Sequence, residues 1–225
     1  MSLYKDASLV MIPSAYKDGK LYSIRPTDGD GDFTFSRGSN LAATRVDVNG
    51  LIEKGRENVL LHSNDFTLGN WSNDAGSCTR TGGQTGYDGS SDAWLITQDT
   101  AGYDNIRSLS TGLTSGVSTM SVYAKAGTSS NMHIRVPSDA ARVEFNLSTG
   151  VATNKGGAIH QGMDDVGGGW YRCYATFNTN VDLVQIYPDF GSSTPVSIYI
   201  QNAQLEKGLV ATDYIETGAS TAQAG

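Results

Sequence analysis

The stretch STMSVYAK, residues 118–125, alternates apolar and polar side chains and decides the fold class. In an extended chain, Met120, Val122 and Ala124 point to one face, while Ser121 and Tyr123 point to the other. This period of two is typical of a half-buried antiparallel strand. The pattern recurs at residues 133–136, 142–147, 170–177, 183–187 and 196–205, with Gly-, Ser- and Asn-rich turns between these segments. The sequence therefore predicts an all-β protein, an antiparallel β-sandwich of the jelly-roll type.

Composition excludes several classes of protein. The 225 residues include 27 Gly, and 17% of them are charged. Glycine above the usual ~7% and charge below the usual ~25% argue against coiled coils and helical bundles. The net charge of −7 provides no basic surface for nucleic acid, and no apolar run approaches the ~20 residues that a spanning helix needs. We expect neither nucleic-acid binding nor membrane insertion, and no simple attraction to lipopolysaccharide phosphates.

Changes in composition along the sequence divide the chain into three parts. Residues 1–58 are expected to form an N-terminal attachment unit that contains a β-hairpin, because Asn49-Gly50 is suited to the positive φ angles of a type I′ turn. This unit has few large apolar residues, so we expect it to lie against the sandwich or against another chain. The jelly-roll sandwich is expected at residues 59–216. Residues 217–225 are small or amide residues and predict a flexible tail.

Motifs for catalysis are missing from the sequence. The sequence has three histidines, at 62, 133 and 160, but no G-x-S-x-G motif that would supply a nucleophilic serine. No two glutamates occupy alternate positions of one strand, as a pair of glycosidase carboxylates would. We therefore expect no enzyme and no catalytic residues. A jelly-roll polysaccharide-degrading enzyme (a depolymerase) that pairs Asp residues from different loops stays open as the alternative.

Metal and thiol chemistry receive weak support. The run DGDGD at residues 28–32 places carboxylates at alternate positions, but Phe33 and Ser39 stand where a calcium loop requires Gly and Glu, so a solvated acidic turn is favoured. The metal content stays unknown and no cofactor is expected. Cys78 and Cys173 are too few for a disulfide scaffold or a zinc site, which favours reduced thiols and leaves one bridge open.

Aromatic residues in loops are the remaining candidates for a site. Sugar rings stack on flat aromatic faces, and nearby Asp, Asn and Gln bond the hydroxyls. Trp94 and Trp170 lie in alternating strands and are expected in the core. Trp71, Tyr87 and Tyr103 lie in or beside Gly-, Asn- and Asp-rich loops, so we predict them as carbohydrate-binding residues.

Two stretches resemble phage virion structural proteins of the tail-fibre or head-fibre type. The first comprises DFTFSRGS (32–39), ATRV (43–46), NGLIE (49–53) and ENVLLHSNDF (57–66). The second comprises GGWYRC (168–173), IYIQNAQLEKG (198–208) and ATDYI (211–215). Their order and spacing both match the family, and together they bracket almost the whole chain.

The resemblance implies a setting. A non-enzymatic virion component, assembled in the host bacterial cytoplasm, would contact other virion proteins and itself, with a homotrimer the commonest arrangement. It would touch host-surface glycans or serve only as a decoration protein.

The predicted sandwich also resembles carbohydrate-binding modules and concanavalin-A-like domains, which commonly hold a structural Ca²⁺ between their first and last strands. Thr67 stands where those modules often have Glu, and Gln201 and Asn202 replace their closing aspartates. The loss of this charge argues against a calcium site here.

Overall fold

The structure is a computed structural model that describes residues 9–17, 20–27, 30–34, 44–46, 52–54, 56–74, 78–109 and 111–224. Apart from one 3₁₀ turn, η2 (Pro137–Asp139), every regular element in these residues is a β-strand. None of the described segments forms a helix of the length and apolarity needed to cross a membrane. The predicted all-β class is confirmed.

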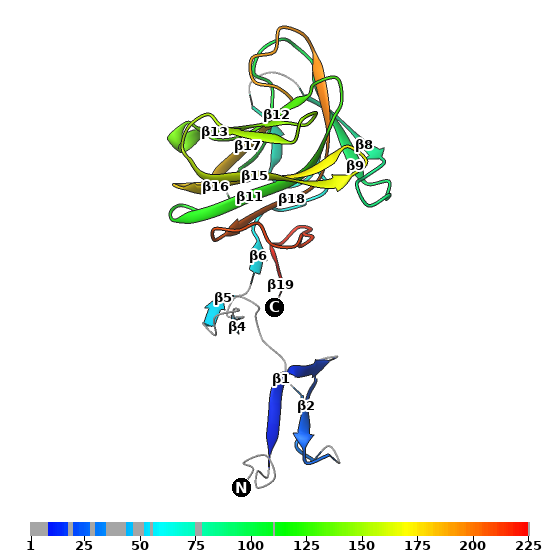
Figure 1. The fold of residues 1–225 in the computed structure, drawn as a ribbon, viewed down its shortest axis with the longest axis vertical. Coiled ribbons are helices and arrows are strands. Elements are labelled where there is room, and N and C mark those ends of the chain that lie inside the picture. Colours follow the sequence, from blue (N-terminus) through cyan, green and yellow to red (C-terminus); the bar gives the residue numbers. More distant parts are fainter. Residues whose placement is uncertain are drawn as a thin grey trace.

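Two six-stranded antiparallel sheets form the sandwich, as the stacked layers of Figure 1 show. Sheet I has the order β14 (Val151–Asn154), β13 (Ala141–Asn146), β12 (Asn131–Val136), β17 (Leu183–Tyr187), β10 (Ile106–Leu109) and β7 (Trp71–Asn73). Sheet II has the order β15 (Ala158–Gly167), β16 (Trp170–Asn178), β11 (Val117–Ala126), β18 (Val196–Lys207), β9 (Ala93–Gln98) and β8 (Cys78–Gln84). The predicted jelly-roll-type β-sandwich is confirmed.

The core lies between the inner faces of the two sheets. Met120, Val122 and Ala124 of β11 are fully buried, as the alternation predicted. Ile134 of β12 and Ile186 of β17 face them from sheet I and are buried equally well. Removing apolar area from water stabilises such a core by roughly 25 cal/mol per Å². Because successive strand residues point to opposite faces, burying these side chains forces their polar neighbours onto the outer faces of the sheets.

The two cysteines are free thiols that lie in the core. Cys78 belongs to β8 and Cys173 to β16, with β9, β18 and β11 between these strands. Four strand spacings of ~4.8 Å place the cysteines roughly 19 Å apart, beyond the ~7 Å limit for a disulfide. The bridge that the sequence left open is excluded in this fold.

Strand β15 was not predicted, because its residues are mostly exposed and do not alternate in hydrophobicity. It forms the edge of sheet II and pairs with β16 from Ala158 to Gly167. Backbone pairing with a strongly patterned neighbour, and not its own sequence pattern, therefore fixes this strand.

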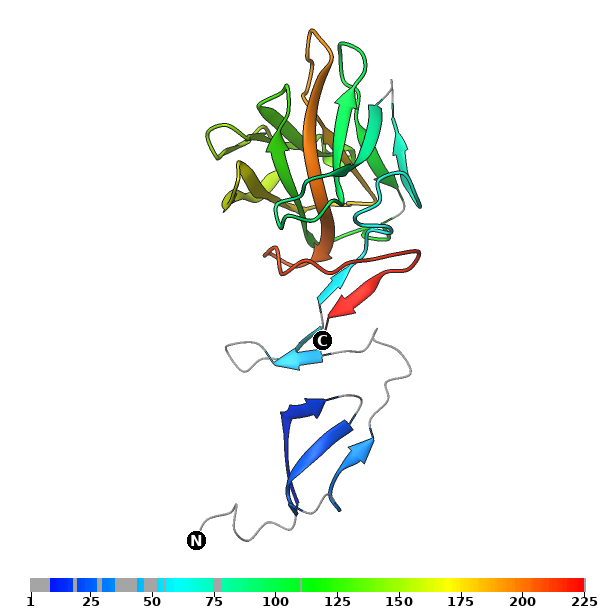
Figure 2. The same cartoon turned by 90° about the vertical axis from the view of Figure 1, so that its right-hand side faces the viewer.

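Short sheets lie outside the sandwich, as Figures 1 and 2 show. Strands β1 (Val10–Lys17), β2 (Lys20–Arg25) and β3 (Phe33–Thr34) form one, and β6 (Arg56–Asn58) pairs with β19 (Ala222–Ala224) in another. The predicted hairpin is present as β4 (Thr44–Val46) and β5 (Ile52–Lys54). Val46 pairs with Ile52, one residue out of register for a two-residue turn at Asn49-Gly50, and the turn itself lies outside the described residues.

The segment expected to be a flexible tail is partly built into the fold, which corrects that expectation. Thr217 is buried, and its hydroxyl donates a hydrogen bond to the carbonyl of Leu60 at 2.6 Å. Its backbone N–H donates to Ser63 Oγ at 2.9 Å. Ala222–Ala224 then pairs with β6, so both chain segments leave the sandwich side by side at one end (Figure 2). Whether residues 1–58 act as a separate attachment unit stays a prediction.

Asn58 ties this end of the sandwich together. Its side chain is fully buried. The Nδ2 group donates to the carbonyls of Ala203 (3.1 Å) and Ile215 (2.8 Å). Its Oδ1 accepts from the N–H groups of Leu60 (3.2 Å) and Leu205 (3.1 Å). One amide thus joins the start of the sandwich to β18 and to the segment that follows β18.

Gln204 and Glu206 extend this network to the segment after β18. Glu206 accepts hydrogen bonds from the backbone N–H and the hydroxyl of Thr212, at 2.8 and 2.6 Å. Gln204 donates to Glu206 Oε1 at 2.8 Å and accepts from the Ile215 N–H at 2.7 Å. We call Asn58, Ser63, Gln204, Glu206, Thr212 and Thr217 the base clasp. All six lie within or next to the motifs that resemble virion proteins, so those motifs encode this architecture.

Candidate functional site

The outer face of sheet I carries a row of polar side chains. Strand register aligns Arg142 with Arg135, Arg135 with Gln185, Gln185 with Arg107, and Arg107 with Ser72. Each of these residues alternates with a residue that points into the core, so burial of the core determines their outward orientation. We call Arg142, Arg135, Gln185 and Arg107 the arginine row.

Gln185 and Asp74 connect the row through hydrogen bonds. Arg135 Nη1 donates to Gln185 Oε1 at 2.8 Å, and the Tyr187 hydroxyl donates to the same oxygen at 3.0 Å. Gln185 Nε2 donates to Asp74 Oδ2 at 2.5 Å, and Asp74 Oδ1 lies 2.5 Å from Arg107 Nη1. Gln185 is only 1% exposed, so the network holds its amide in one orientation.

A second row, two residues further along the strands, contains Glu144, His133 and Tyr187. His133 Nε2 lies 3.5 Å from Asp189 Oδ1 and 3.8 Å from Glu144 Oε2. Burial lowers the pKa of His133 to about 4, although both carboxylates act in the opposite direction. His133 is therefore neutral near pH 7. The sequence predicted an ordinary strand histidine, and His133 does lie within β12.

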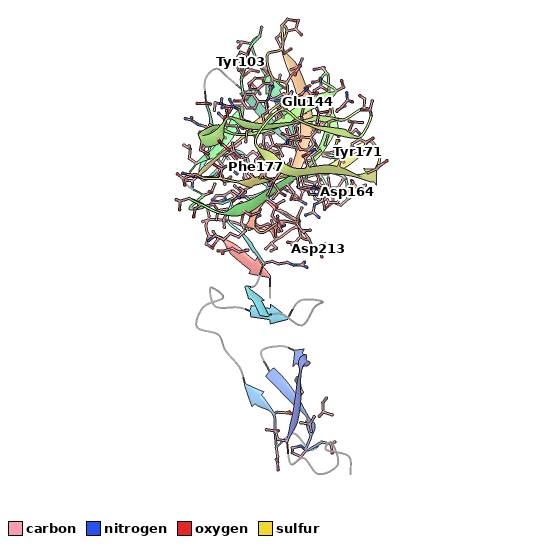
Figure 3. All side chains as sticks on the ribbon, turned by 60° about the vertical axis from the view of Figure 1, so that its left-hand side comes forward. Tyr103, Glu144, Asp164, Tyr171, Phe177 and Asp213 are labelled. Atoms are coloured by element: carbon pink, nitrogen blue, oxygen red, sulfur yellow. The ribbon has the colours of Figure 1, made fainter. Side chains whose placement is uncertain are left out.

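Aromatic side chains lie at the end of this face that carries His133 and Tyr187. The Phe190 ring packs edge-on against Tyr103 and Tyr187, with ring centroids 4.8 and 5.1 Å apart. The Arg142 guanidinium lies 3.8 Å above the centre of the Phe190 ring. Tyr103 remains 58% exposed and offers a flat apolar surface at the rim. Figure 3 labels Tyr103 and Glu144 in the part of the sandwich far from the N-terminal strands.

Backbone pairing between two loops positions Tyr103. Gly102 and Ser192 form an isolated antiparallel bridge, and Gly191 N–H donates to the Gly102 carbonyl at 2.9 Å. Gly191 has φ +88° and lies so close to Tyr103 that a Cβ atom would stand 3.3 Å from the ring. The positive φ favours glycine there, and a larger side chain would also have to displace the Tyr103 ring by a few tenths of an ångström.

Of the three predicted carbohydrate-binding residues, the structure places only Tyr103 on this face. Tyr87 lies over sheet II, where its ring stacks on Tyr123 at 3.8 Å with an interplanar angle of 4°. One face of the Tyr87 ring is therefore covered by the protein itself. A role for Tyr87 in glycan binding stays a prediction.

Trp71 is only 4% exposed, which corrects the exposure expected for it. Its indole N–H donates to the Leu61 carbonyl at 3.1 Å, and its ring packs edge-on against Phe66. Pairing with β10 turns this first residue of β7 toward the core. Trp170 is buried as expected, while Trp94 is partly buried against the core.

Sequence reasoning missed Arg107, Arg135, Arg142, Gln185 and Phe190. The alternation in residues 133–136 and 142–147 already placed Arg135 and Arg142 at outward positions. Their neighbours come from strands distant in sequence, and the sequence does not give the register of those strands.

Gln201 stands where the carbohydrate-binding modules that the sequence resembles have a closing aspartate, and its side-chain amide points at two carboxylates. Gln201 Nε2 donates to Asp92 Oδ1, Ser90 Oγ and Asp88 Oδ1 at 2.5, 3.1 and 3.3 Å. The Tyr87 N–H donates to Gln201 Oε1 at 3.0 Å, which fixes the amide with its N–H groups toward the carboxylates. Because N–H donors repel a cation, this arrangement does not fit Ca²⁺. In the described part of the chain, no three His, Cys, Asp or Glu side chains are grouped as metal ligands would be.

No protein-family model matches the chain, and no curated protein matches its sequence. Among solved structures, a family 22 xylan-binding domain of a Paenibacillus barcinonensis xylanase is similar over 70% of this chain and 99% of that one, with 16% identity and a TM-score of 0.41. The xylanase 10B modules of Clostridium thermocellum, complexed with xylohexaose, match 72% of this chain and 30% of theirs, with 12% identity and a TM-score of 0.41. The enzymatically active domain of bacteriophage CBA120 tailspike protein 4 matches 66% of this chain and 21% of its own, with 14% identity and a TM-score of 0.38.

Proposed function

We propose that this chain is a non-enzymatic β-sandwich module that binds glycans on the outer face of sheet I. The observation that carries the proposal is the exposed Tyr103 ring beside the hydrogen-bonded arginine row. The C–H face of a sugar stacks on an aromatic ring, while its hydroxyls bond to amide, carboxylate and guanidinium groups. Both kinds of partner occur together on this face.

The face is rigid before any ligand arrives. Gln185 and Tyr187 are nearly buried and hydrogen-bonded to each other, and both belong to a central strand of the sheet. A site whose side chains are already ordered loses little conformational entropy when it binds. Strand residues also hold their positions better than residues in free loops.

Glycan-array binding and affinity electrophoresis of Tyr103→Ala test this proposal. We expect the variant to lose at least about tenfold in affinity for any glycan that the native protein binds, because the stacking platform is gone. Tyr199→Ala, on the outer face of sheet II, is the matched control and should bind normally. Loss of binding in Tyr87→Ala with no change in Tyr103→Ala would move the site to sheet II. Binding of no glycan by the native protein would overturn the proposal.

We further propose that the module is part of a phage virion, in a tail or head fibre, where it contacts other virion proteins and itself as a homotrimer. The motif resemblance supports this setting. A hollow of about 550 Å³ at the clasp end, lined in part by Arg56, Lys207, Leu209 and Val210, provides a contact surface. Leu209 and Val210 are 61% and 68% exposed there. Light scattering of the full chain should give three times the monomer mass, and Leu209→Asp should lower it. A monomeric native chain would contradict the trimer.

A depolymerase is the second candidate, because Glu144 and Asp189 both approach His133 on this face. Two carboxylates on either side of a sugar are the requirement for glycoside hydrolysis. Here the neutral imidazole of His133 lies between them, which favours binding over hydrolysis. Release of reducing ends from a polysaccharide, abolished by Asp189→Asn, would establish the enzyme in place of the binding module.

A further inference from the structure

The arginine row concentrates positive charge on one face of an acidic protein. Arg135 and Arg142 are direct cross-strand partners on β12 and β13. Like charges in this position destabilise a sheet. Arg107 adds a third cation to the same row, on the far side of Gln185. An arrangement that costs stability and lies at the surface needs a reason outside the folded chain itself.

The carboxylates around the row are engaged with other groups. Asp74 pairs with Arg107 at 2.5 Å, and Glu144 lies 3.3 Å from Lys155 Nζ. Asp189 accepts a hydrogen bond from the Phe190 N–H at 2.7 Å and lies beside His133. Among the described residues, no carboxylate forms an ion pair with Arg135 or Arg142. Arg135 donates instead to a neutral amide, and Arg142 covers an aromatic ring.

The pKa of the Tyr187 phenol responds to the charges of the two arginines. Burial raises its pKa, and the charges of Arg135 and Arg142 oppose that rise. Arg142 also lowers the pKa of His133, although Glu144 and Asp189 act in the opposite direction. Tyr187 therefore feels both arginines, and His133 feels Arg142.

We infer that the glycan bound by this face is acidic, with a carboxylate or sulfate group that lies between Arg135 and Arg142. The inference rests on the proposed glycan binding and adds the class of sugar. Guanidinium groups present planar, paired N–H donors that match carboxylate and sulfate oxygens. An anion at this point would also remove the repulsion between the two arginines. The Tyr103 ring, joined to Arg142 through Phe190, would then support the neighbouring sugar.

Affinity electrophoresis and calorimetry with the full chain test the inference with four polymers. Polygalacturonate supplies carboxylates, dextran sulfate supplies sulfates, and dextran and arabinogalactan are neutral. We expect binding to one of the two acidic polymers at least about tenfold tighter than to either neutral polymer, since hydrogen bonds to charged groups are the stronger ones. Which acidic polymer binds distinguishes a carboxylate from a sulfate ligand.

Two variants with the same change in net charge distinguish binding at the outer face of sheet I from nonspecific electrostatic attraction. Arg135→Gln should weaken binding to the acidic polymer at least about tenfold. Lys125→Gln, which removes the same charge from sheet II, should leave it within about twofold, because exposed charges beyond ~8–10 Å are screened. Arg135→Lys should fall between the native protein and Arg135→Gln, because lysine keeps the charge and loses the paired donors. Circular dichroism and melting temperature confirm that the variants are folded.

The outcomes distinguish this inference from the proposed function. Equal binding of neutral and acidic polymers, unchanged in Arg135→Gln but lost in Tyr103→Ala, would overturn the acidic class and keep the glycan-binding module. Equal weakening by Arg135→Gln and Lys125→Gln would also overturn it, because attraction would then be nonspecific. Binding of none of the polymers, and of no sugar on an array, would overturn both.

Discussion

The base clasp and the arginine row are both polar networks built on the strands of one sandwich, yet their charges are arranged in opposite ways. In the clasp, Asn58 makes four hydrogen bonds to backbone groups and Glu206 is bonded by Thr212. In the row, Arg135 faces Arg142 with no carboxylate between them. A network whose groups are all satisfied within the chain stabilises the fold. A row of like charges at the surface adds no such stability, and this contrast is the basis on which we propose a binding function for it.

The virion-like motifs and the arginine row lie in different parts of the molecule. Three of the motifs that resemble virion proteins, ENVLLHSNDF (57–66), IYIQNAQLEKG (198–208) and ATDYI (211–215), contain clasp residues, so these three describe how the chain ends are held. The arginine row lies outside those motifs. These motifs therefore specify architecture, while the proposed ligand face is formed by residues at unremarkable positions of ordinary strands.

The largest change in stability is expected when the base clasp is broken. Asn58→Ala leaves two buried N–H groups and two carbonyls without their partner, so we expect the free energy of unfolding to fall by about 3–5 kcal/mol. Urea denaturation measures it. The exposed Asn178→Ala should change stability by less than about 0.5 kcal/mol. A loss below about 1 kcal/mol in Asn58→Ala would show that the clasp is not the structural element described here.

Lowering the pH should destabilise the fold through His133. Its pKa is about 4 in the folded protein, against an ordinary value of 6.5. Between these values the unfolded chain binds a proton that the folded chain does not, so stability falls as the pH drops from 6.5 to 4, by up to about 3 kcal/mol. Glu144, Asp189 and Arg142 face the imidazole and set its charge balance.

His133→Gln should make the free energy of unfolding less dependent on pH in that window, as followed by urea denaturation at several pH values. The exposed His160→Gln is the control and should keep the native profile. An unchanged slope in His133→Gln would show that other groups cause the acid sensitivity.

Within the arginine row, a substitution should change stability little. Arg142→Gln removes a like-charge pair and also a guanidinium stacked on Phe190, two opposing contributions of about 0.5–1 kcal/mol each. We expect a net change of less than about 1 kcal/mol by the same urea assay. A loss as large as that of Asn58→Ala would make the row structural and remove the contrast between the two regions.

The smallest effect concerns the thiols. Burial raises the pKa of Cys78 to about 12 and that of Cys173 well above its ordinary value. Thiolate, the reactive form, is therefore scarce at pH 8. Iodoacetamide should label neither cysteine in the native protein and both in urea, as counted by mass spectrometry. Rapid labelling under native conditions would show that the core opens easily.

The sequence was sufficient to predict the sandwich but not the proposed ligand face. Residues 183–187 were predicted as a strand and form β17 with the same bounds, because their alternation is strong. Arg135, Gln185 and Arg107 meet only through pairings between strands distant in sequence, and that register follows from the assembled core. Trp71 was predicted to be exposed because it follows a loop, and nothing in the sequence indicated the short strand β7 that turns it inward. The net charge of −7 gave no sign of the arginine row. The expectation of no simple attraction to lipopolysaccharide phosphates stays a prediction.

A titration of the ¹⁵N-labelled chain with an acidic oligosaccharide, followed by backbone amide NMR, tests the central claim most directly. We predict saturable shifts on β12, β13, β17 and β10 and at Tyr103, with the clasp residues from 204 to 217 unchanged. Shifts confined to the clasp or to sheet II around Tyr87, or no shifts with any sugar that the protein binds on an array, would contradict the account.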